Sequence, residues 1–349
     1  MAGNQRLALR LATSTGILGL TVTSGLAMVA NHLVDEFSRP HNHLHDMTFT
    51  WGLPQDSEEP PRTCQRSLLF KTADGTLLCG DFWAQPCSAP TIVLCHGYRT
   101  SRSYLRAAAA LQYSLGYNVF FFDFRGHGDS DSVITSAGNA EVRDLEAALV
   151  VASRQPETLP GKIILYGFSM GAAVALLTPP HSDVVAIIAD SPYARSDDII
   201  RRIIQYRLMQ VSNRGPLLQS LRSLVPVLSW TVMIACTVVF RLRYGFGVVA
   251  RPDTSFKRWK ARARTVLQQH SLPILLIHGG DDTFIPIEHA RQIAAEAKAH
   301  DVPLETFFVE GAGHCGAYLF DPQNYHRTIQ QFLMRYLGND FPVQHRNIG

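Results

Sequence analysis

The sequence contains few charged residues. Asp, Glu, Lys and Arg make up 17% of its 349 residues, whereas they make up roughly 25% of typical soluble domains. The formal net charge at pH 7 is only +3, so the chain lacks the overall basic character of a nucleic-acid-binding protein, and we expect no nucleic-acid partner. The shortage of charge indicates contact with a membrane. The length suits one α/β domain with an insertion.

The sequence also lacks closely spaced cysteine pairs. No Cys-x-x-Cys motif occurs, so a zinc site is not expected. Cys95 lies in an apolar run and is expected in the core, whereas Cys64, Cys79 and Cys87 could include a disulfide if the compartment is oxidising. The sequence leaves that alternative open.

A charge-free segment lies near the N-terminus. Residues 11–30 hold no charged side chain and follow Arg6 and Arg10, and a helix needs about 20 such residues to span a bilayer. We therefore predict a membrane anchor over residues 1–36. A secretory signal peptide cleaved near Gly25-Leu26-Ala27 and a buried helix are the alternatives. The two arginines place the N-terminus in the cytoplasm, so the rest of an anchored chain lies outside it, and a cleaved chain is secreted.

Residues 37–64 are predicted to form a linker. His41, His43 and His45 alternate there, which superficially resembles a metal site. In a polar segment just after an anchor, we interpret them as part of a solvated linker. The proline-rich stretch 54–61 then leads into the folded domain.

From residue 65 onward, strand patterns alternate with helix patterns. Asp74-Gly75 separates the first two expected strands, as in a hairpin. The alternation predicts an α/β fold whose largely parallel sheet is covered by helices on both faces, formed by residues 65–193 and 271–340. The expected strands are 66–72, 77–83, 91–95, 118–123, 162–166, 184–190, 274–277 and 304–309. The expected helices are 103–115, 140–153, one directly after Ser169, 287–299 and 325–337.

Ser169 is the candidate nucleophile. It lies at the centre of Gly167-Phe-Ser-Met-Gly171, between an apolar strand-like run and a small-residue helix-like run. A serine on such a tight turn is lifted clear of the sheet, and the flanking glycines leave room for the turn. The N-terminus of the following helix favours developing negative charge. The alternative is an incidental serine in a glycine-rich turn.

Two residues downstream are candidates for the acid and the base. A nucleophilic serine needs a base, and the base needs an orienting acid. In this kind of fold the chain order is serine, acid, histidine, each after a strand. Asp282 follows the strand 274–277 and His314 follows the strand 304–309, so we predict that they are the acid and the base. Asp281 and Asp190 are rival acids; a helix cap at Asp282 and a turn role for His314 are the structural alternatives.

The negatively charged oxygen of a tetrahedral intermediate needs two amide donors. We expect them to be the backbone N–H of Met170, directly after the nucleophile, and the N–H of Tyr98, in the loop after the strand 91–95.

The segment Asp123-Phe-Arg125-Gly-His-Gly128-Asp-Ser130 is interpreted as a structural turn without a chemical role. We expect Asp123 and Arg125 to form a local ion pair within it.

Residues 194–270 interrupt the alternation and are too long for a simple connection, so we predict a helical cap. The segment holds fourteen Arg and Lys against three Asp, a net charge of +11, and includes an uncharged apolar run at 224–240. A single membrane span there would put Ser169 and His314 on opposite sides of the membrane, so we reject it. The cap either packs its apolar run over the active site or rests on anionic lipid.

Together these motifs resemble those of the α/β-hydrolases. They are most similar to the bacterial serine-aminopeptidase-like and monoglyceride-lipase-like branch, including membrane-anchored members, and the resemblance covers about residues 65–338. It implies an α/β-hydrolase fold and a Ser-His-Asp hydrolase without metal or organic cofactor, and it does not fix the substrate. The motifs that carry it are His96-Gly97-Tyr98, Asp123-x-Arg125-Gly-x-Gly128-x-Ser130, Gly167-Phe-Ser169-Met-Gly171, Asp190-Ser-Pro-Tyr193, His278-Gly-x-x-Asp282-x-x-Ile-Pro286 and Gly313-His314.

The sequence thus predicts a serine hydrolase that acts through an acyl-enzyme on a small-molecule or lipid-like carboxylic ester. The positive charge of the cap suits an anionic or lipid-borne substrate. A serine peptidase or amidase is the alternative, and a non-catalytic anchored scaffold is a distant third. The expected partner besides the substrate is a membrane, contacted by the N-terminal helix and by the basic cap.

Overall fold

The computed structural model describes residues 23–40, 58–213, 215, 219–220, 222–259 and 272–338. Residues 1–22, which hold most of the predicted anchor, and His41, His43 and His45 lie outside the described residues. All six cysteines lie within them as free thiols, so none of Cys64, Cys79 and Cys87 is in a disulfide in this structure.

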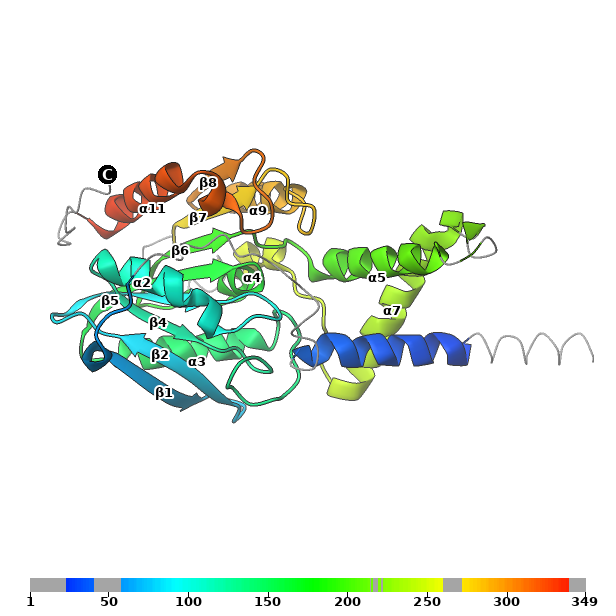
Figure 1. The fold of residues 1–349 in the computed structure, drawn as a ribbon, viewed down its shortest axis with the longest axis horizontal. Coiled ribbons are helices and arrows are strands. Elements are labelled where there is room, and N and C mark those ends of the chain that lie inside the picture. Colours follow the sequence, from blue (N-terminus) through cyan, green and yellow to red (C-terminus); the bar gives the residue numbers. More distant parts are fainter. Residues whose placement is uncertain are drawn as a thin grey trace, which may run out of the picture. The chain divides into compact units, whose positions relative to one another are not determined.

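An eight-stranded sheet forms the centre of the larger part of the chain (Figure 1). Its strand order is β1-β2-β4-β3-β5-β6-β7-β8. β1 pairs antiparallel with β2, and β2 pairs antiparallel with β4, while all other neighbours are parallel. The strands are β1 (Gln65–Lys71), β2 (Leu77–Trp83), β3 (Ala89–Cys95), β4 (Asn118–Phe122), β5 (Thr158–Phe168), β6 (Val184–Asp190), β7 (Ile274–Gly279) and β8 (Leu304–Val309).

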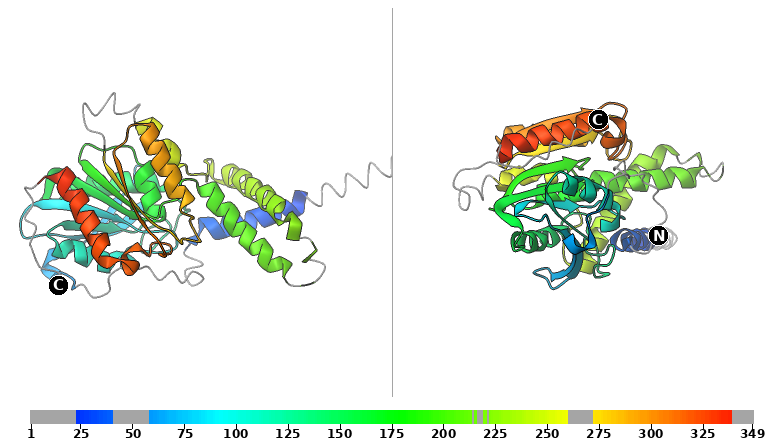
Figure 2. Two further views of the ribbon diagram at one scale, coloured as in Figure 1. Left: turned by 90° about the horizontal axis from the view of Figure 1, so that it is seen from above. Right: turned by 60° about the vertical axis from the view of Figure 1, so that its left-hand side comes forward.

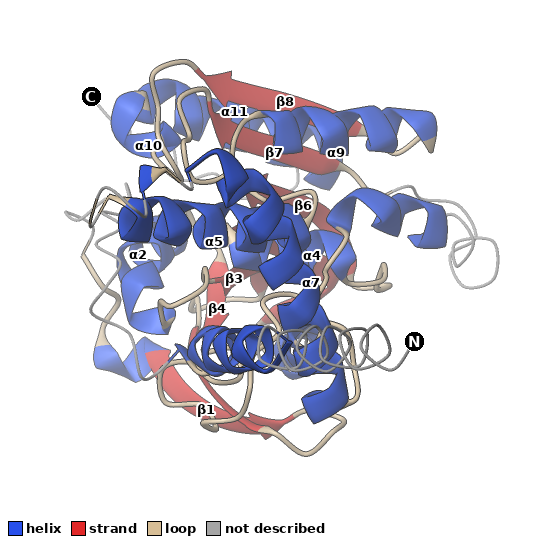
Figure 3. Ribbon diagram, turned by 90° about the vertical axis from the view of Figure 1, so that its right-hand side faces the viewer, coloured by secondary structure: helices blue, strands red, loops and turns tan. Residues whose placement is uncertain are grey.

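Helices cover both faces of this sheet (Figure 3). α2 (Arg106–Ser114) and α11 (Pro322–Leu337) pack on one face, where a continuous core joins their apolar side chains to alternate residues of the strands. Figure 2 shows α11 running along that face. α3 (Glu141–Ser153), α4 (Met170–Leu177) and α9 (Glu288–Ala299) lie on the other face. The predicted α/β-hydrolase fold, with a mostly parallel sheet between two layers of helices, is confirmed.

Short helical elements complete this part of the chain. Arg102–Leu105 (η3) precedes α2, and α10 (Ala317–Phe320) precedes α11. α11 is a separate helix from α10 and begins at Pro322. The Asp321 carboxylate caps its first turn by accepting a hydrogen bond from the Asn324 N–H. This part of the chain also contains η2 (Arg62–Cys64) and η5 (Pro252–Thr254).

The chain divides into two compact units. The sheet and its helices belong to the unit of residues 38–199 and 249–349. The other unit is helical and consists of residues 1–37, as far as they are described, and residues 200–248. It contains a helix whose described part covers residues 23–38, most of α5 (Ser196–Ser212), η4 (Arg222–Leu224) and α7 (Val225–Tyr244). The predicted boundaries of anchor, linker, core and cap stay a prediction.

One helix among the described residues is long and apolar enough to cross a membrane. It comprises Arg222–Tyr244 and has a mean hydropathy of 2.0 over its most apolar window. This finding rests on length and composition only. The core helix of a soluble protein can meet the same criteria.

Candidate active site

Ser169 lies at a strained turn between β5 and α4. Its backbone has φ 53° and ψ −115°, a conformation that costs free energy for any residue with a Cβ. The turn is tight because Gly167 lies against the backbone of α4: a Cβ added at Gly167 would lie 2.4 Å from the carbonyl carbon of Gly171. The main-chain N–H of Ser169 donates to the carbonyl of Asp190, at the end of β6, with an N–O distance of 2.8 Å. The close contact at Gly167 and the hydrogen bond to Asp190 therefore hold the serine at the carboxyl edge of the sheet.

Ser169, His314 and Asp282 form one chain of hydrogen bonds. Nε2 of His314 lies 2.9 Å from Oγ of Ser169, and Nδ1 of His314 lies 2.7 Å from Oδ2 of Asp282. An ionised carboxylate can only accept, so Nδ1 carries the ring proton and Nε2 is left to accept from the serine hydroxyl. The structure thus brings together the three residues that the sequence singles out, from the ends of β5, β7 and β8.

The Asp282 carboxylate is fixed by its own loop. Oδ1 accepts hydrogen bonds from the backbone N–H groups of Phe284 and Ile285, at 2.9 and 2.8 Å, which leaves Oδ2 for His314. The side chain is fully buried. Because the acceptors of Asp282 are filled by its loop and by His314, its side chain does not cap α9, which starts six residues later at Glu288.

His278 supports the same loop, a role that the sequence did not reveal. Its Nε2 donates to the carbonyl of Ile285 at 2.7 Å, and it is fully buried behind Asp282. Burial disfavours the imidazolium form and lowers the pKa of His278. A neutral His278 therefore braces the turn that carries the acid. The only available signal was its place in the motif that begins with His278 and ends with Pro286.

The two amides expected to bind the oxyanion lie on elements that touch. Met170 is the first residue of α4. A Cβ added at Gly171, the next residue, would lie 2.2 Å from the carbonyl oxygen of Cys95 and 2.7 Å from that of His96. The N-terminus of α4 therefore packs directly on the end of β3, where the loop to Tyr98 begins. Backbone amides at a helix N-terminus favour negative charge nearby.

Two buried histidines hold the loop that contains Tyr98. Nε2 of His96 accepts from the N–H of Phe124 at 3.0 Å, and Nε2 of His127 accepts from the N–H of Arg99 at 3.2 Å. Their rings are 5.1 Å apart. Accepting at Nε2 requires the neutral form, and burial lowers the pKa of His96 to about 4 and lowers that of His127 as well. Nδ1 of His96 also donates to the carbonyl of Gly97 at 2.7 Å, so neutral histidines hold the backbone on both sides of Tyr98.

The rival acids lie elsewhere in the hydrogen-bond network. The carboxyl group of Asp190 accepts from the hydroxyl of Tyr325 at 2.8 Å and from that of Ser191 at 2.9 Å, and its burial raises its pKa to about 6. Ser191 Oγ in turn accepts from the N–H of Cys315, next to His314, at 3.1 Å. Asp190 therefore braces the backbone near the site. Asp281 is exposed.

The expected ion pair between Asp123 and Arg125 is wrong. Asp123 pairs with Arg102, whereas Arg125 pairs with Asp144 at 2.7 Å and with Asp74 at 2.9 Å. The partners come from residues distant in the sequence: Arg102 lies on η3, Asp144 lies on α3, and Asp74 lies between β1 and β2. A Cβ at Gly128 would overlap the Asp123 carboxylate, which instead accepts the N–H of Asp129 at 2.9 Å. The segment is a structural turn, but it is tied to its surroundings by other ion pairs.

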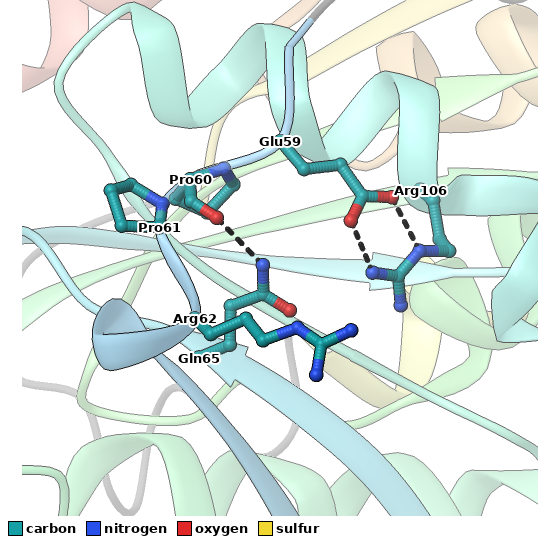
Figure 4. A pocket seen from close by; sticks show the side chains of 6 residues that line it. All are labelled: Glu59, Pro60, Pro61, Arg62, Gln65 and Arg106. Atoms are coloured by element: carbon teal, nitrogen blue, oxygen red, sulfur yellow. Dashed lines mark hydrogen bonds and ion pairs between the residues drawn. The ribbon is translucent and has the colours of Figure 1, made fainter.

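A separate pocket of about 590 Å³ lies beside η2 (Figure 4). None of the three candidate catalytic residues lines it. Two contacts hold its wall: Glu59 forms a bidentate ion pair with Arg106, and Gln65 donates to the carbonyl of Pro60 at 2.7 Å. Its lining residues are Glu59, Pro60, Pro61, Arg62, Gln65 and Arg106.

Comparisons with known proteins agree with this fold. An uncharacterized protein of Bacillus subtilis, YqkD, is 27% identical over 246 residues, which cover 70% of each chain. The esterase Pf2001 of Pyrococcus furiosus has a similar structure, with a TM-score of 0.57 and 24% identity over 82% of this chain and 98% of that one. The acylaminoacyl peptidase of Pyrococcus horikoshii has a TM-score of 0.52 and 17% identity, over 80% of this chain and 43% of that one. The profile of the alpha/beta hydrolase family matches residues 92–328, and the chain belongs to that family.

Proposed function

We propose that this protein is a serine hydrolase that cleaves carboxylic esters through a covalent acyl-enzyme. The observation that carries the proposal is the hydrogen-bonded chain from Ser169 through His314 to Asp282. This arrangement can turn a serine hydroxyl into a nucleophile at neutral pH. Its place at the carboxyl ends of parallel strands, where open α/β sheets bind their ligands, supports the same proposal.

In the proposed reaction, the oxygen of Ser169 attacks the carbonyl carbon of the ester while His314 takes the serine proton. Asp282 holds the imidazole ring and stabilises the imidazolium that forms. The backbone N–H groups of Tyr98 and Met170 bind the negatively charged oxygen. His314 then protonates the leaving alcohol, which departs as the acyl-enzyme forms. A water molecule, deprotonated by His314, releases the acid and restores Ser169.

We propose a hydrophobic or lipid-like ester as the substrate. The basic, partly apolar segment 194–270, with a net charge of +11, supports an anionic or lipid-borne substrate better than a peptide with a charged amino terminus. Anchoring by residues 1–36, with the α/β unit outside the cytoplasm, would bring the enzyme to such substrates.

Turnover of two matched substrate series tests the proposal. The purified full chain is assayed with p-nitrophenyl esters of increasing acyl length and with aminoacyl p-nitroanilides. We expect ester turnover that rises with chain length and disappears in Ser169→Ala while the melting temperature stays unchanged. Turnover of the anilides alone would make the protein a peptidase or amidase, and undiminished ester turnover in Ser169→Ala would overturn the mechanism.

A further inference from the structure

α7 carries no charged residue over most of its length. Residues 225–240 contain no charged side chain. One face of the helix is buried, through Val225, Ser229, Val232, Met233, Cys236 and Phe240. The opposite face is exposed, with exposed fractions of 65% for Val227, 56% for Ile234, 51% for Val238 and 81% for Leu242. A surface helix of a soluble protein carries polar residues at such positions. Among the residues that the structure describes, nothing covers this face of α7.

The helix whose described part covers residues 23–38 packs against α7 within the helical unit. Ala30 is fully buried, and its carbonyl accepts from the Cys236 thiol at 3.8 Å. Arg243, at the end of α7, donates to Asn31 at 3.0 Å and pairs with Asp35 at 2.8 Å. Residues 23–30 of this partner helix belong to the uncharged segment 11–30 within the predicted anchor, residues 1–36. α7 therefore lies beside the part of the chain that is expected to enter a membrane.

Residues 200–248 of the helical unit carry charge of one sign, whereas Asp35 and Glu36 in its other segment pair with Arg243 and Arg207. Residues 199–252 contain eight arginines and no Lys, Asp or Glu. The guanidinium of Arg201 lies 5.2 Å from the ring centroid of Trp230, which is 46% exposed on α7. Arg241 and Arg243 follow the apolar run directly. Exposed apolar side chains next to arginines and a tryptophan are typical of helices that lie in the interface of an anionic bilayer.

We propose that the exposed face of α7, formed by Val227, Trp230, Ile234, Val238 and Leu242, docks on an anionic lipid bilayer. α7 lies along the interface and does not span it, because Ser169 precedes α7, His314 follows it, and the two residues are hydrogen-bonded. A second copy of the chain fits this face less well, because two arginine-rich units repel each other. The proposal concerns where the enzyme sits and does not depend on which bond it cleaves.

Fluorescence quenching of Trp230 by brominated lipid tests the proposal on the full chain. The protein is reconstituted into phosphatidylcholine and phosphatidylglycerol vesicles, with and without bromine on the acyl chains. Subtracting the emission of Trp230→Phe isolates the signal of Trp230 from that of the other three tryptophans, Trp51, Trp83 and Trp259. An anchor in residues 1–36 would hold the protein at the vesicle in either case, so the quenching reports on α7 itself. We expect brominated lipid to remove most of the Trp230 signal.

A matched pair of variants controls for nonspecific effects. Val238→Glu places a charge on the proposed docking face and should restore much of the Trp230 emission in brominated vesicles. Val150→Glu places the same charge on an exposed valine of α3 and should leave the quenching unchanged. Replacing phosphatidylglycerol by phosphatidylcholine should weaken the quenching, and quenching that is indifferent to this change would contradict the role of anionic lipid.

Unquenched Trp230 in brominated vesicles would overturn the proposal. In that case, the full-length protein is cross-linked through residue 238, and its oligomeric state is measured by gel filtration in detergent. The two measurements together identify what covers the exposed face of α7. A cross-linked dimer would show a second copy on this face, and an intramolecular cross-link to residues 1–22 would show that the chain covers α7 itself. Both results exclude lipid docking.

Discussion

The carbonyl oxygen of Cys95 lies 2.2 Å from the position that a Cβ at residue 171 would occupy. The first turn of α4 therefore fits against the end of β3 only because residue 171 is glycine. This contact fixes the distance between the loop that contains Tyr98 and the N-terminus of α4, which supply the two proposed oxyanion donors.

Gly171→Ala should separate these two elements. The backbone of α4 must move away from β3, so one amide no longer reaches the oxyanion, and we expect kcat for a p-nitrophenyl ester to fall by about 10²- to 10³-fold. Gly247→Ala is the matched control, because a Cβ there meets no atom within 4 Å. Equal kinetics for the two variants would show that the contact at Gly171 does not position the site.

Asp282→Asn should impair catalysis without unfolding the protein. An amide at this position no longer favours the ring tautomer with the proton on Nδ1, and in a Ser-His-Asp site this costs about 10⁴-fold in kcat. Two neighbouring carboxylates serve as controls: Asp281→Asn should have no effect, and Asp190→Asn should cost much less. A larger loss of kcat in Asp190→Asn than in Asp282→Asn would show that Asp190, and not Asp282, is the acid that orients His314.

Arg125→Met should destabilise the α/β unit strongly. The Arg125 side chain is 6% exposed, and its removal leaves the fully buried Asp144 without its main partner, which costs about 3–5 kcal/mol in the free energy of unfolding. Burial already raises the pKa of Asp144 to about 7, so the loss should shrink as the pH falls and Asp144 takes up a proton.

Arg143→Met is the control for this measurement. Arg143 also pairs with Asp74, but its side chain is 47% exposed, so its removal should cost no more than about 1 kcal/mol. Urea denaturation of both variants and of the wild type measures the difference. Similar losses in the free energy of unfolding for the two variants would mean that the Arg125–Asp144 pair does not stabilise the protein more because it is buried.

The buried His96 should make stability depend on pH. Its pKa in the folded protein is about 4, whereas in the unfolded chain it is about 6.5. The unfolded state therefore binds the proton first, and the free energy of unfolding falls as the pH decreases from about 6.5 to about 4, by up to about 3 kcal/mol from this residue.

His96→Asn, which cannot take up this proton, isolates the effect. The wild type should be the more stable protein at pH 7 by urea denaturation, and its advantage should decrease by about 2–3 kcal/mol near pH 4. A stability difference that is the same at both pH values would contradict a neutral, buried His96.

Much of the α/β unit could be predicted from local patterns. β6 and β8 begin and end at the predicted residues, because each is an apolar or β-branched run bounded by turn residues. Asp74-Gly75 correctly predicted the hairpin of β1 and β2. Ser169, Asp282 and His314 were found together because each follows a strand in the order that the fold requires.

The sequence was less informative where a side chain depends on partners far along the chain. The pairing of Arg125 with Asp144 and of Asp123 with Arg102 joins separate elements, and no local spacing encodes it. The bracing role of His278 requires knowledge of the loop geometry around Ile285. The arrangement of α7 beside the helix that contains Ala30 joins segments about 200 residues apart, which no periodicity reveals.

Covalent labelling of Ser169 by a fluorophosphonate tests the central proposal most directly. The reagent forms a stable bond only with a serine whose hydroxyl is activated by a base. Mass spectrometry of the digested protein should find the adduct on Ser169 in the wild type. No adduct should form in Ser169→Ala, and its formation should be strongly slowed in His314→Ala. Absence of the adduct from folded wild-type protein, or equal labelling of Ser169→Ala at another residue, would contradict a catalytic Ser169.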